Sequence, residues 1–230
     1  MNILAFDTTT PACSAALWRN GDVASSRSEV IGTGHAERLM PMIDEMLASA
    51  NTRYDALDGL GVTRGPGSFT GVRIGLATAR GLALATGLPL VGLSTLDVLA
   101  AGISRAVAGE RNIVAVLDAR RGQFYVAVYG PDGAPGMDAE AIAVSDMAER
   151  LSGQLSAAGV ILCGTGATLV QPVLAAAGID AVVDTGNTHP SATAIARIAA
   201  ENLDSGIIPG PVAPLYLRGS GAARPAVGQT

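Results

Sequence analysis

Residues 62–87 read VTRGPGSFTGVRIGLATARGLALATG, and this stretch decides the fold of the chain. The largely apolar run over 57–62 is predicted to form a strand that leads into the turn over 64–67. Ser68 is a good N-cap residue, because its hydroxyl can accept a hydrogen bond from the free amides of a first helical turn. The stretch therefore predicts a strand, a glycine-rich turn and a long helix, in that order.

The predicted helix carries small residues at every fourth position, namely Gly71, Gly75, Ala79 and Ala83. Residues four apart lie on one face of a helix, and each glycine destabilises a helix by roughly 1 kcal/mol relative to alanine. A face without bulk suits the close approach of another backbone. That backbone belongs either to the chain's own sheet or to a helix of a partner protein, and spacing alone leaves both hypotheses open.

Composition excludes several classes of function. All fifteen basic residues among the 230 are arginine, which rules out a lysine nucleophile, a Schiff base and a P-loop lysine. The net charge of −5 is unusual for a protein that neutralises many phosphates by itself, so nucleic acid is expected to be held through a partner. Cys13 and Cys163 lie in apolar runs and are expected to be buried free thiols. With no signal peptide and no apolar run of membrane-spanning length, we expect a cytoplasmic protein.

The two halves of the chain repeat one order of elements. In the first half we expect strands over 2–6, 12–18 and 23–30, a helix over 35–50, a strand over 57–62, the small-residue helix, a strand over 89–92 and a helix over 94–104. In the second half we expect strands over 112–117, 123–129 and 140–144, a helix from Ser145 to 156, a strand over 160–163, a helix over 167–177, a strand over 181–183 and a helix over 190–203.

Each first strand ends in an aspartate, Asp7 or Asp118. Three antiparallel strands followed by alternating helices and strands is the order of the ribonuclease H-like fold. Two copies predict an α/β protein of two such lobes, with mixed sheets flanked by helices, as in the actin, sugar-kinase and Hsp70 superfamily. We expect lobes over 1–106 and 107–218, and a disordered tail over 219–230.

The helix over 35–50 is amphipathic, with Pro41 expected to kink it or mark a restart. One face carries Ala36, Leu39, Met40, Ile43, Met46, Leu47 and Ala50.

The loop after the first strand is a candidate phosphate site. Asp7 can hold hydrated Mg²⁺, and the hydroxyls of Thr8 and Thr9 can hold phosphate. Gly164 and Gly166 stand before a predicted helix, whose first amides can bind an anion. In the alternative, Asp7 caps the strand end, the threonines fill a turn, and the two glycines form a tight strand-to-helix turn.

The remaining chemistry candidates are few. Arg120 and Arg121 could bind a phosphate or an acidic partner, or form a solvated turn. His35 and His189 are distant in sequence and lack the spacing of a metal pair; each is expected at a helix start. A Ser-His-Asp triad stays open by spacing, although no Gly-x-Ser-x-Gly motif supports one.

Five segments together resemble one protein family. They are Asp7-Thr8-Thr9 with Ala12-Cys13-Ser14, the helix over 35–47, the block Gly65-Pro66-Gly67-Ser68-Phe69-Thr70-Gly71-Val72-Arg73-Ile74-Gly75, Asp118-Ala119-Arg120 with Tyr125, and Pro214-Leu215-Tyr216-Leu217-Arg218. In this order they are similar to the TsaB family, also called YeaZ, over essentially the whole chain to Arg218.

The resemblance implies a two-lobed actin-like fold and a role in threonylcarbamoylation of adenosine 37 in tRNAs that read ANN codons. It implies a non-catalytic subunit, a heterodimer partner of the catalytic subunit TsaD, with the ATPase TsaE joining the pair. It further implies homodimers when the chain is alone, contact with tRNA only through the complex, no membrane, no required cofactor and at most weak binding of ATP or ADP with Mg²⁺.

The resemblance also places the partner interface on the two helices of the first lobe. The residues implied are Leu39, Met40, Ile43, Met46, Leu47, Gly71, Val72, Gly75, Ala79 and Ala83. The segment over 91–97 lacks the His-x-x-x-His metal pair of TsaD proteins, which favours a non-catalytic subunit. Two alternatives remain: a nucleotide-binding ATPase or glycopeptidase-like enzyme of the same superfamily, and a self-associating module with another partner, such as an acetyltransferase.

Overall fold

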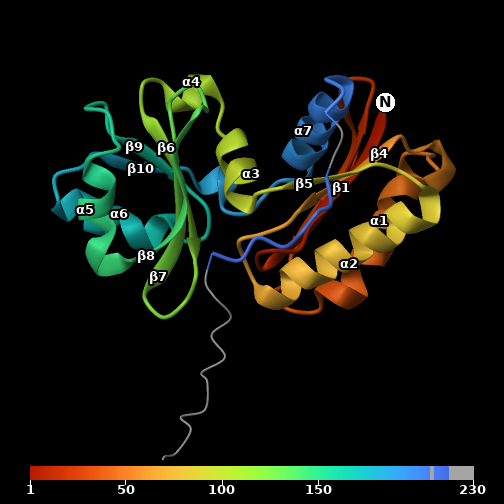
Figure 1. Cartoon of the computed structure of the whole chain (residues 1–230), viewed down its shortest axis with the longest axis horizontal. Helices are drawn as coiled ribbons and strands as arrows, with labels where there is room; N and C mark the ends of the chain where they lie inside the picture. The colour runs from red at the N-terminus through yellow and green to blue at the C-terminus, as the bar shows by residue number, and fades with distance from the viewer. Residues whose placement is uncertain (208–209, 218–230) are drawn as a thin grey trace, which may run out of the picture.

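The computed structural model describes residues 1–207 and 210–217 and contains two five-stranded sheets, each the centre of one lobe (Figure 1). The predicted fold class, two ribonuclease H-like lobes with mixed sheets and flanking helices, is confirmed. The expected disordered tail over 219–230 lies outside the described residues, as does Arg218.

The first sheet has the order β3-β2-β1-β4-β5. Its strands are β1 (Asn2–Asp7), β2 (Ala12–Arg19), β3 (Asp22–Val30), β4 (Gly59–Thr63) and β5 (Leu90–Leu93). The first three are antiparallel, and β1, β4 and β5 are parallel. The turn between β2 and β3 is a tight hairpin at Asn20-Gly21, where both residues take a positive φ.

The second sheet repeats this topology in the order β10-β9-β6-β7-β8. Its strands are β6 (Asn112–Asp118), β7 (Gln123–Tyr129), β8 (Pro135–Ala143), β9 (Val160–Cys163) and β10 (Ala181–Val183). Again three strands are antiparallel and three, β6, β9 and β10, are parallel. The repeated element order in the sequence therefore corresponds to a repeated structure.

Two helices exchange lobes, which corrects the expected boundaries. Helix α3 (Thr95–Ala101) precedes residue 106 but packs on β6 and β7 of the second sheet. Helix α7 (Ala192–Asp204) follows residue 107 but packs on β1, β2 and β4 of the first sheet. Figure 1 shows α7 beside the first sheet and α3 beside the second. Sequence order does not reveal the exchange, since it depends on the direction in which each connection leaves its sheet.

The other helices cover the opposite faces of the sheets. On the first sheet, α1 (His35–Ser49) and α2 (Phe69–Thr86) lie side by side opposite α7 (Figure 1). On the second sheet, α5 (Met147–Ser152) and α6 (Ala167–Ala176) share a core with the face opposite α3. Helix α1 continues through Pro41 without a break, so of the two alternatives, a kink or a restart, the restart is wrong.

Three local predictions need correction. The helix expected over 94–104 is α3, which ends earlier, at Ala101, and Ser104 caps a separate short helix, α4 (Arg105–Ala108). The strand expected over 140–144 is the longer β8. The helix expected from Ser145 to 156 is α5, six residues long, and the Ser145 hydroxyl bonds to Asp146 instead of capping it. In the described part of the chain, three single-turn 3₁₀ helices, η1 (Tyr54–Ala56), η2 (Val144–Asp146) and η3 (Thr185–Asn187), complete the fold.

The small-residue face of α2 lies against the chain's own β1–β2 loop. A Cβ added to Gly71 would stand 1.9 Å from the carbonyl oxygen of Thr8, and one added to Gly75 would stand 2.7 Å from its Oγ1. Ser68 caps the helix as predicted, with its hydroxyl accepting from the Gly71 amide at 3.3 Å. Of the two hypotheses for this small-residue face, packing within the chain's own fold therefore holds for these two glycines, Gly71 against the Thr8 backbone and Gly75 against its side chain.

Gly81 lies in the same helix but outside this contact, since a Cβ there would meet no atom within 4 Å. We therefore expect one substitution to have opposite effects at two positions. Gly71→Ala should lower the free energy of unfolding by about 1–3 kcal/mol or more, because the methyl group overpacks the contact with Thr8. Gly81→Ala should raise it by about 1 kcal/mol through helix propensity. Urea unfolding of the two variants measures this, and a similar loss at both positions would contradict it.

Candidate functional site

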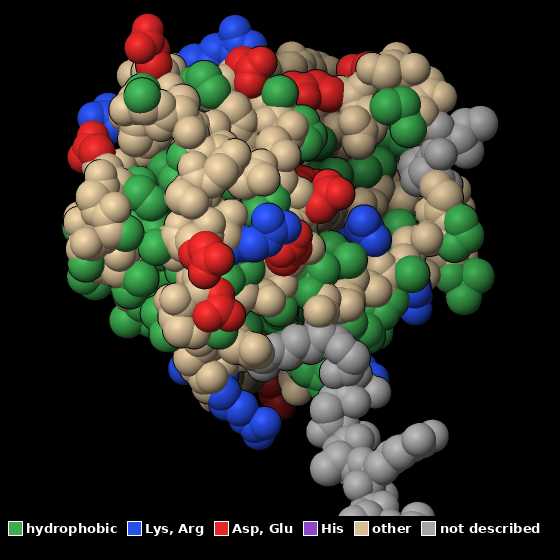
Figure 2. Space-filling model, turned by 60° about the vertical axis from the view of Figure 1, so that its left-hand side comes forward, with side chains coloured by type: hydrophobic (Ala, Val, Ile, Leu, Met, Phe, Trp, Pro, Cys, Tyr) green, Lys and Arg blue, Asp and Glu red, His purple; other side chains and the backbone are tan. Residues whose placement is uncertain are grey.

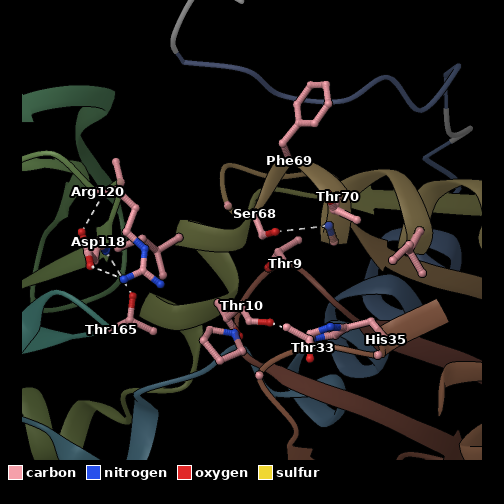
Figure 3. Close-up of a pocket in the computed structure, with 18 of the residues that line it drawn as sticks. Thr9, Thr10, Thr33, His35, Ser68, Phe69, Thr70, Asp118, Arg120 and Thr165 are labelled. Carbon is pink, nitrogen blue, oxygen red and sulfur yellow. Dashed lines mark hydrogen bonds and ion pairs between the residues drawn. The ribbon is translucent and has the colours of Figure 1, made fainter. Parts of the chain in front are cut away.

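A cleft of about 930 Å³ separates the lobes, and both lobes line it. The first lobe contributes the β1–β2 loop, the N-terminal ends of α1 and α2, and the loop before α1. The second lobe contributes the β6–β7 turn and the start of α6. The polar side chains on its wall are Thr9, Thr10, Thr33, His35, Glu37, Ser68, Thr70, Asp118, Arg120, Tyr125 and Thr165 (Figure 3).

Asp7 lies behind this wall and is fully buried. Its Oδ1 accepts hydrogen bonds from the Thr9 amide (3.2 Å), the Thr9 hydroxyl (2.6 Å) and the Thr63 hydroxyl. Its Oδ2 is buried and has no hydrogen-bond partner among the described residues. Burial raises the pKa of Asp7 to about 6, and the three hydrogen bonds and the nearby His35 offset part of that effect.

The next three residues are held by elements from across the molecule. The Thr8 hydroxyl donates to the carbonyl of Gly71 at 2.7 Å, and the Thr9 carbonyl accepts from the Ser68 amide at 2.8 Å. Thr10 has contacts with both histidines of the chain. His35 Nε2 lies 3.0 Å from its carbonyl oxygen, and His189 Nδ1 lies 3.1 Å from its hydroxyl. The loop is thus a fixed junction, since its polar groups are used inside the fold.

Both histidines therefore help to hold Thr10 in place, although they are far apart in the sequence. His35 is the first residue of α1, as predicted, and its Nε2 carries the proton, because both oxygens that it approaches are backbone carbonyls. His189 precedes α7, and burial lowers its pKa. Among the described residues no cluster of three or more His, Cys, Asp or Glu side chains is arranged to hold a metal ion.

The second lobe faces the cleft with a tight turn. Arg120 and Arg121 have φ values of 65° and 56° and form this turn with Gly122. The Asp118 carboxylate accepts from the Arg120 amide at 2.7 Å and lies 3.6 Å from its guanidinium, while the Asp118 amide donates to Thr165 Oγ1 at 3.1 Å. In the structure these two arginines thus form a turn at the cleft edge, and this turn is held by the contacts between Asp118 and Arg120.

The phosphate prediction does not fit the cleft at four of its five residues. Asp7 and Thr8 lie behind the wall, and only Thr9 lines it. Gly164 and Gly166 pack internally: a Cβ on Gly164 would stand 2.3 Å from the Val116 carbonyl oxygen, and one on Gly166 would stand 2.7 Å from the Phe124 ring. These glycines therefore serve the close contact of α6 with its own sheet, and no bound Mg²⁺ or phosphate is assigned to this set.

The predicted interface residues are mostly core residues. The side chains of Leu39, Ile43, Met46, Leu47, Val72 and Ala79 are at most 2% exposed and belong to the core of the first lobe, and Gly71 and Gly75 are buried. Only Met40 and Ala83 are partly exposed. The amphipathic pattern of each helix marks the face toward the sheet, so a partner has to meet the opposite face.

The outer face of α2 holds a second small-residue series that the sequence reasoning missed. Ala77, Gly81 and Ala85 are exposed, and Leu84 beside them is 89% exposed. The series repeats every four residues, like the inner one, but is shifted by two positions. The sequence could have distinguished the two series by the large apolar residues Val72 and Leu76. They stand next to Gly71 and Gly75 on the same side of the helix, which identifies the inner series as the one that faces the core.

On the face shown in Figure 2, acidic and basic side chains are interspersed with apolar ones. Among the described residues, no helix combines the length and apolar composition needed to cross a bilayer.

The fold and the cleft define the class of protein: two ribonuclease H-like lobes with a cleft between them, as in actin-like proteins. Solved structures outside the immediate family agree in fold alone. The component A of (R)-2-hydroxyglutaryl-CoA dehydratase from Acidaminococcus fermentans is 12% identical with a TM-score of 0.56, over 89% of this chain and 99% of that one.

Closer matches define the family. The family model "TsaD: tRNA N6-adenosine threonylcarbamoyltransferase" matches residues 27–207. The tRNA threonylcarbamoyladenosine biosynthesis protein TsaB of Escherichia coli is 41% identical over 169 residues, 72% of each chain, and that of Bacillus subtilis is 36% identical over 129 residues, 56% of this chain and 55% of the relative. The structure of YeaZ from Pseudomonas aeruginosa is 31% identical with a TM-score of 0.79, over 94% of this chain and 99% of that one. The chain belongs to the TsaB family of tRNA threonylcarbamoyladenosine biosynthesis proteins.

The buried Asp7 predicts a pH dependence of stability. Its pKa is 3.8 in an unfolded chain and about 6 in the fold. Below pH 3.8 both states are protonated, and as the pH rises to about 6 the unfolded state loses the proton first, so stability falls. Two pKa units correspond to on the order of 3 kcal/mol. We expect urea unfolding to show that Asp7→Asn gains stability relative to the wild type between pH 4 and 7. A difference that stays constant with pH would contradict the assignment.

Proposed function

We propose that this chain is a non-catalytic subunit of the complex that adds threonylcarbamoyl to adenosine 37 of tRNAs reading ANN codons. In this proposal it binds the catalytic subunit TsaD through the outer face of α1 and α2 and organises it, and TsaE joins the pair. Family membership supports the pathway, and the repeated lobe architecture supports pairing with a subunit of related fold.

One observation carries the proposal for the outer face. Gly81 destabilises α2 by roughly 1 kcal/mol relative to alanine, yet the fold gives no reason for it, since a Cβ there would meet open space. Gly71 and Gly75, in contrast, are explained by Thr8. A glycine without an internal neighbour, on an exposed face with Ala77 and Leu84, is what close approach of an outside helix requires.

The proposal of a non-catalytic role rests on the β1–β2 loop, whose polar groups form hydrogen bonds inside the fold. The Thr8 and Thr9 hydroxyls donate inside the fold, and Asp7 is sealed behind them. In the same proposal the chain needs no cofactor of its own, meets tRNA through the complex in the cytoplasm, and pairs with a second copy when TsaD is absent.

Gly81→Arg tests the outer face. Arginine is a good helix former, so the fold should persist while its long side chain keeps a partner helix away. We expect the variant to lose the 1:1 complex with TsaD of the same organism in size-exclusion chromatography with light scattering. Ala175→Arg, at an exposed position of α6 on the other lobe, is the matched control and should bind normally. Normal binding by folded Gly81→Arg would refute the outer face as the docking site.

A nucleotide-binding enzyme is the second candidate, because the cleft is lined by both lobes and has room for a small molecule. If the chain were an ATPase acting through Asp7, the purified protein would hydrolyse MgATP and lose that activity in Asp7→Ala. Our proposal expects no hydrolysis above background in either protein and binding of MgATP no tighter than about 1 mM.

A further inference from the structure

The C-terminal segment over 210–217 returns across the first lobe and lies along α2. The Leu215 amide donates to the Arg64 carbonyl at 2.7 Å, and the Arg80 guanidinium donates to the Val212 carbonyl. Gly92 makes room for this segment, since a Cβ there would stand 2.3 Å from Val212 Cγ1. The segment is thus built into the surface of the lobe next to the outer face of α2.

Three side chains join this segment to the start of α2. The rings of Phe69 and Tyr216 stack with centroids 5.7 Å apart and planes 30° apart. Arg73 lies over the Phe69 ring, with Cζ 3.7 Å from its centroid, and its Nε donates to the Tyr216 hydroxyl at 3.3 Å. Figure 3 shows Phe69 directed away from Thr9 and Thr10, toward this segment.

This cluster is exposed although it is ordered by its own contacts. Phe69 is 54% exposed and Tyr216 is 45% exposed. Stacking and cation–π contacts stabilise this arrangement, and they hold in one conformation an arginine that would otherwise sample many. Aromatic and arginine side chains fixed in advance are the usual anchors of protein interfaces, because little conformational entropy remains to be lost on binding.

The charges on α2 indicate what kind of partner surface the cluster of Phe69, Arg73 and Tyr216 would bind. Arg73 and Arg80 are the charged residues of this helix, which has no acidic residue. In the part of the chain that the structure describes, neither guanidinium lies within ion-pair distance of a carboxylate. In a protein of net charge −5, this edge of α2 is locally basic. It suits a partner surface that carries a carboxylate, because arginine and carboxylate can form a strong bidentate ion pair.

We infer that the Phe69–Arg73–Tyr216 cluster is a second anchor of the docking surface, which takes a carboxylate-bearing surface of the TsaD subunit. The inference rests on the proposed function and extends its docking surface from α1 and α2 onto the C-terminal segment. A protein surface is favoured over RNA for two reasons. The Phe69 ring is already in contact with Tyr216 and Arg73, and the outer face of α2 carries the exposed apolar Leu84 and the small residues Ala77 and Gly81 beside its two arginines.

The test measures the affinity of the full chain for TsaD by isothermal titration calorimetry, at a temperature where each variant is folded by circular dichroism. Tyr216→Ala and Arg73→Glu should each weaken binding at least tenfold, and Tyr216→Phe, which keeps the ring, should stay within threefold of the wild type. Leu169→Ala and Arg105→Glu, exposed on the second lobe, are the matched controls and should stay within twofold.

The outcomes separate the inference from the function on which it rests. Wild-type affinity in Tyr216→Ala and Arg73→Glu, together with lost binding in Gly81→Arg, would overturn the second anchor and leave the proposed function standing. A purely structural role would lower the melting temperature of Tyr216→Ala without changing its affinity, and this too would overturn the inference. The inference would also be overturned if Arg73→Glu kept its affinity for TsaD but its complex with TsaD no longer bound tRNA, because the cluster would then be assigned to RNA binding. No binding by the wild type would overturn both.

Discussion

The contact between the inner face of α2 and the β1–β2 loop is the constraint on which the first lobe depends. Gly71 lets the helix reach the backbone carbonyl of Thr8 and Gly75 lets it reach the Thr8 side chain, and the Ser68 amide donates to the Thr9 carbonyl where the helix begins. Elements that start far apart in the chain, α1 through His35 and the α7 connection through His189, converge on Thr10. The loop is therefore occupied by the chain itself, and the face of α2 that remains available points outward.

Much of the fold could be predicted because it follows from local pattern. The two ribonuclease H-like lobes follow from strand alternation and from the repeated order of elements, and the start of α2 follows from Ser68. The exchange of α3 and α7 between lobes could not be predicted, because each helix has one apolar face that suits either sheet. The side on which it packs depends on long-range geometry, which periodicity does not contain.

The site was harder to predict for a related reason. Two small-residue series run along α2, and spacing alone does not say which one faces inward; the structure decides it through Thr8 for the inner series and open space at Gly81 for the outer. The resemblance likewise led us to expect core residues such as Ile43 at the interface, because an amphipathic pattern does not say whether its apolar face meets the sheet or a partner. Asp7 and the glycines at 164 and 166 are structural for the same physical reason, because close packing and anion binding both favour glycine and short polar side chains at strand ends.

The inner face of α2 serves the fold, and in our proposal the outer face serves a partner. Thiol labelling tests it directly, since Cys13 and Cys163 are buried and give little background. A single cysteine at the position of Leu84 should react quickly with a maleimide in the free chain and at least tenfold more slowly with saturating TsaD. One at the position of Val107, 55% exposed on the other lobe, should react at the same rate in both states. Equal rates at position 84 with and without the bound subunit would contradict the account.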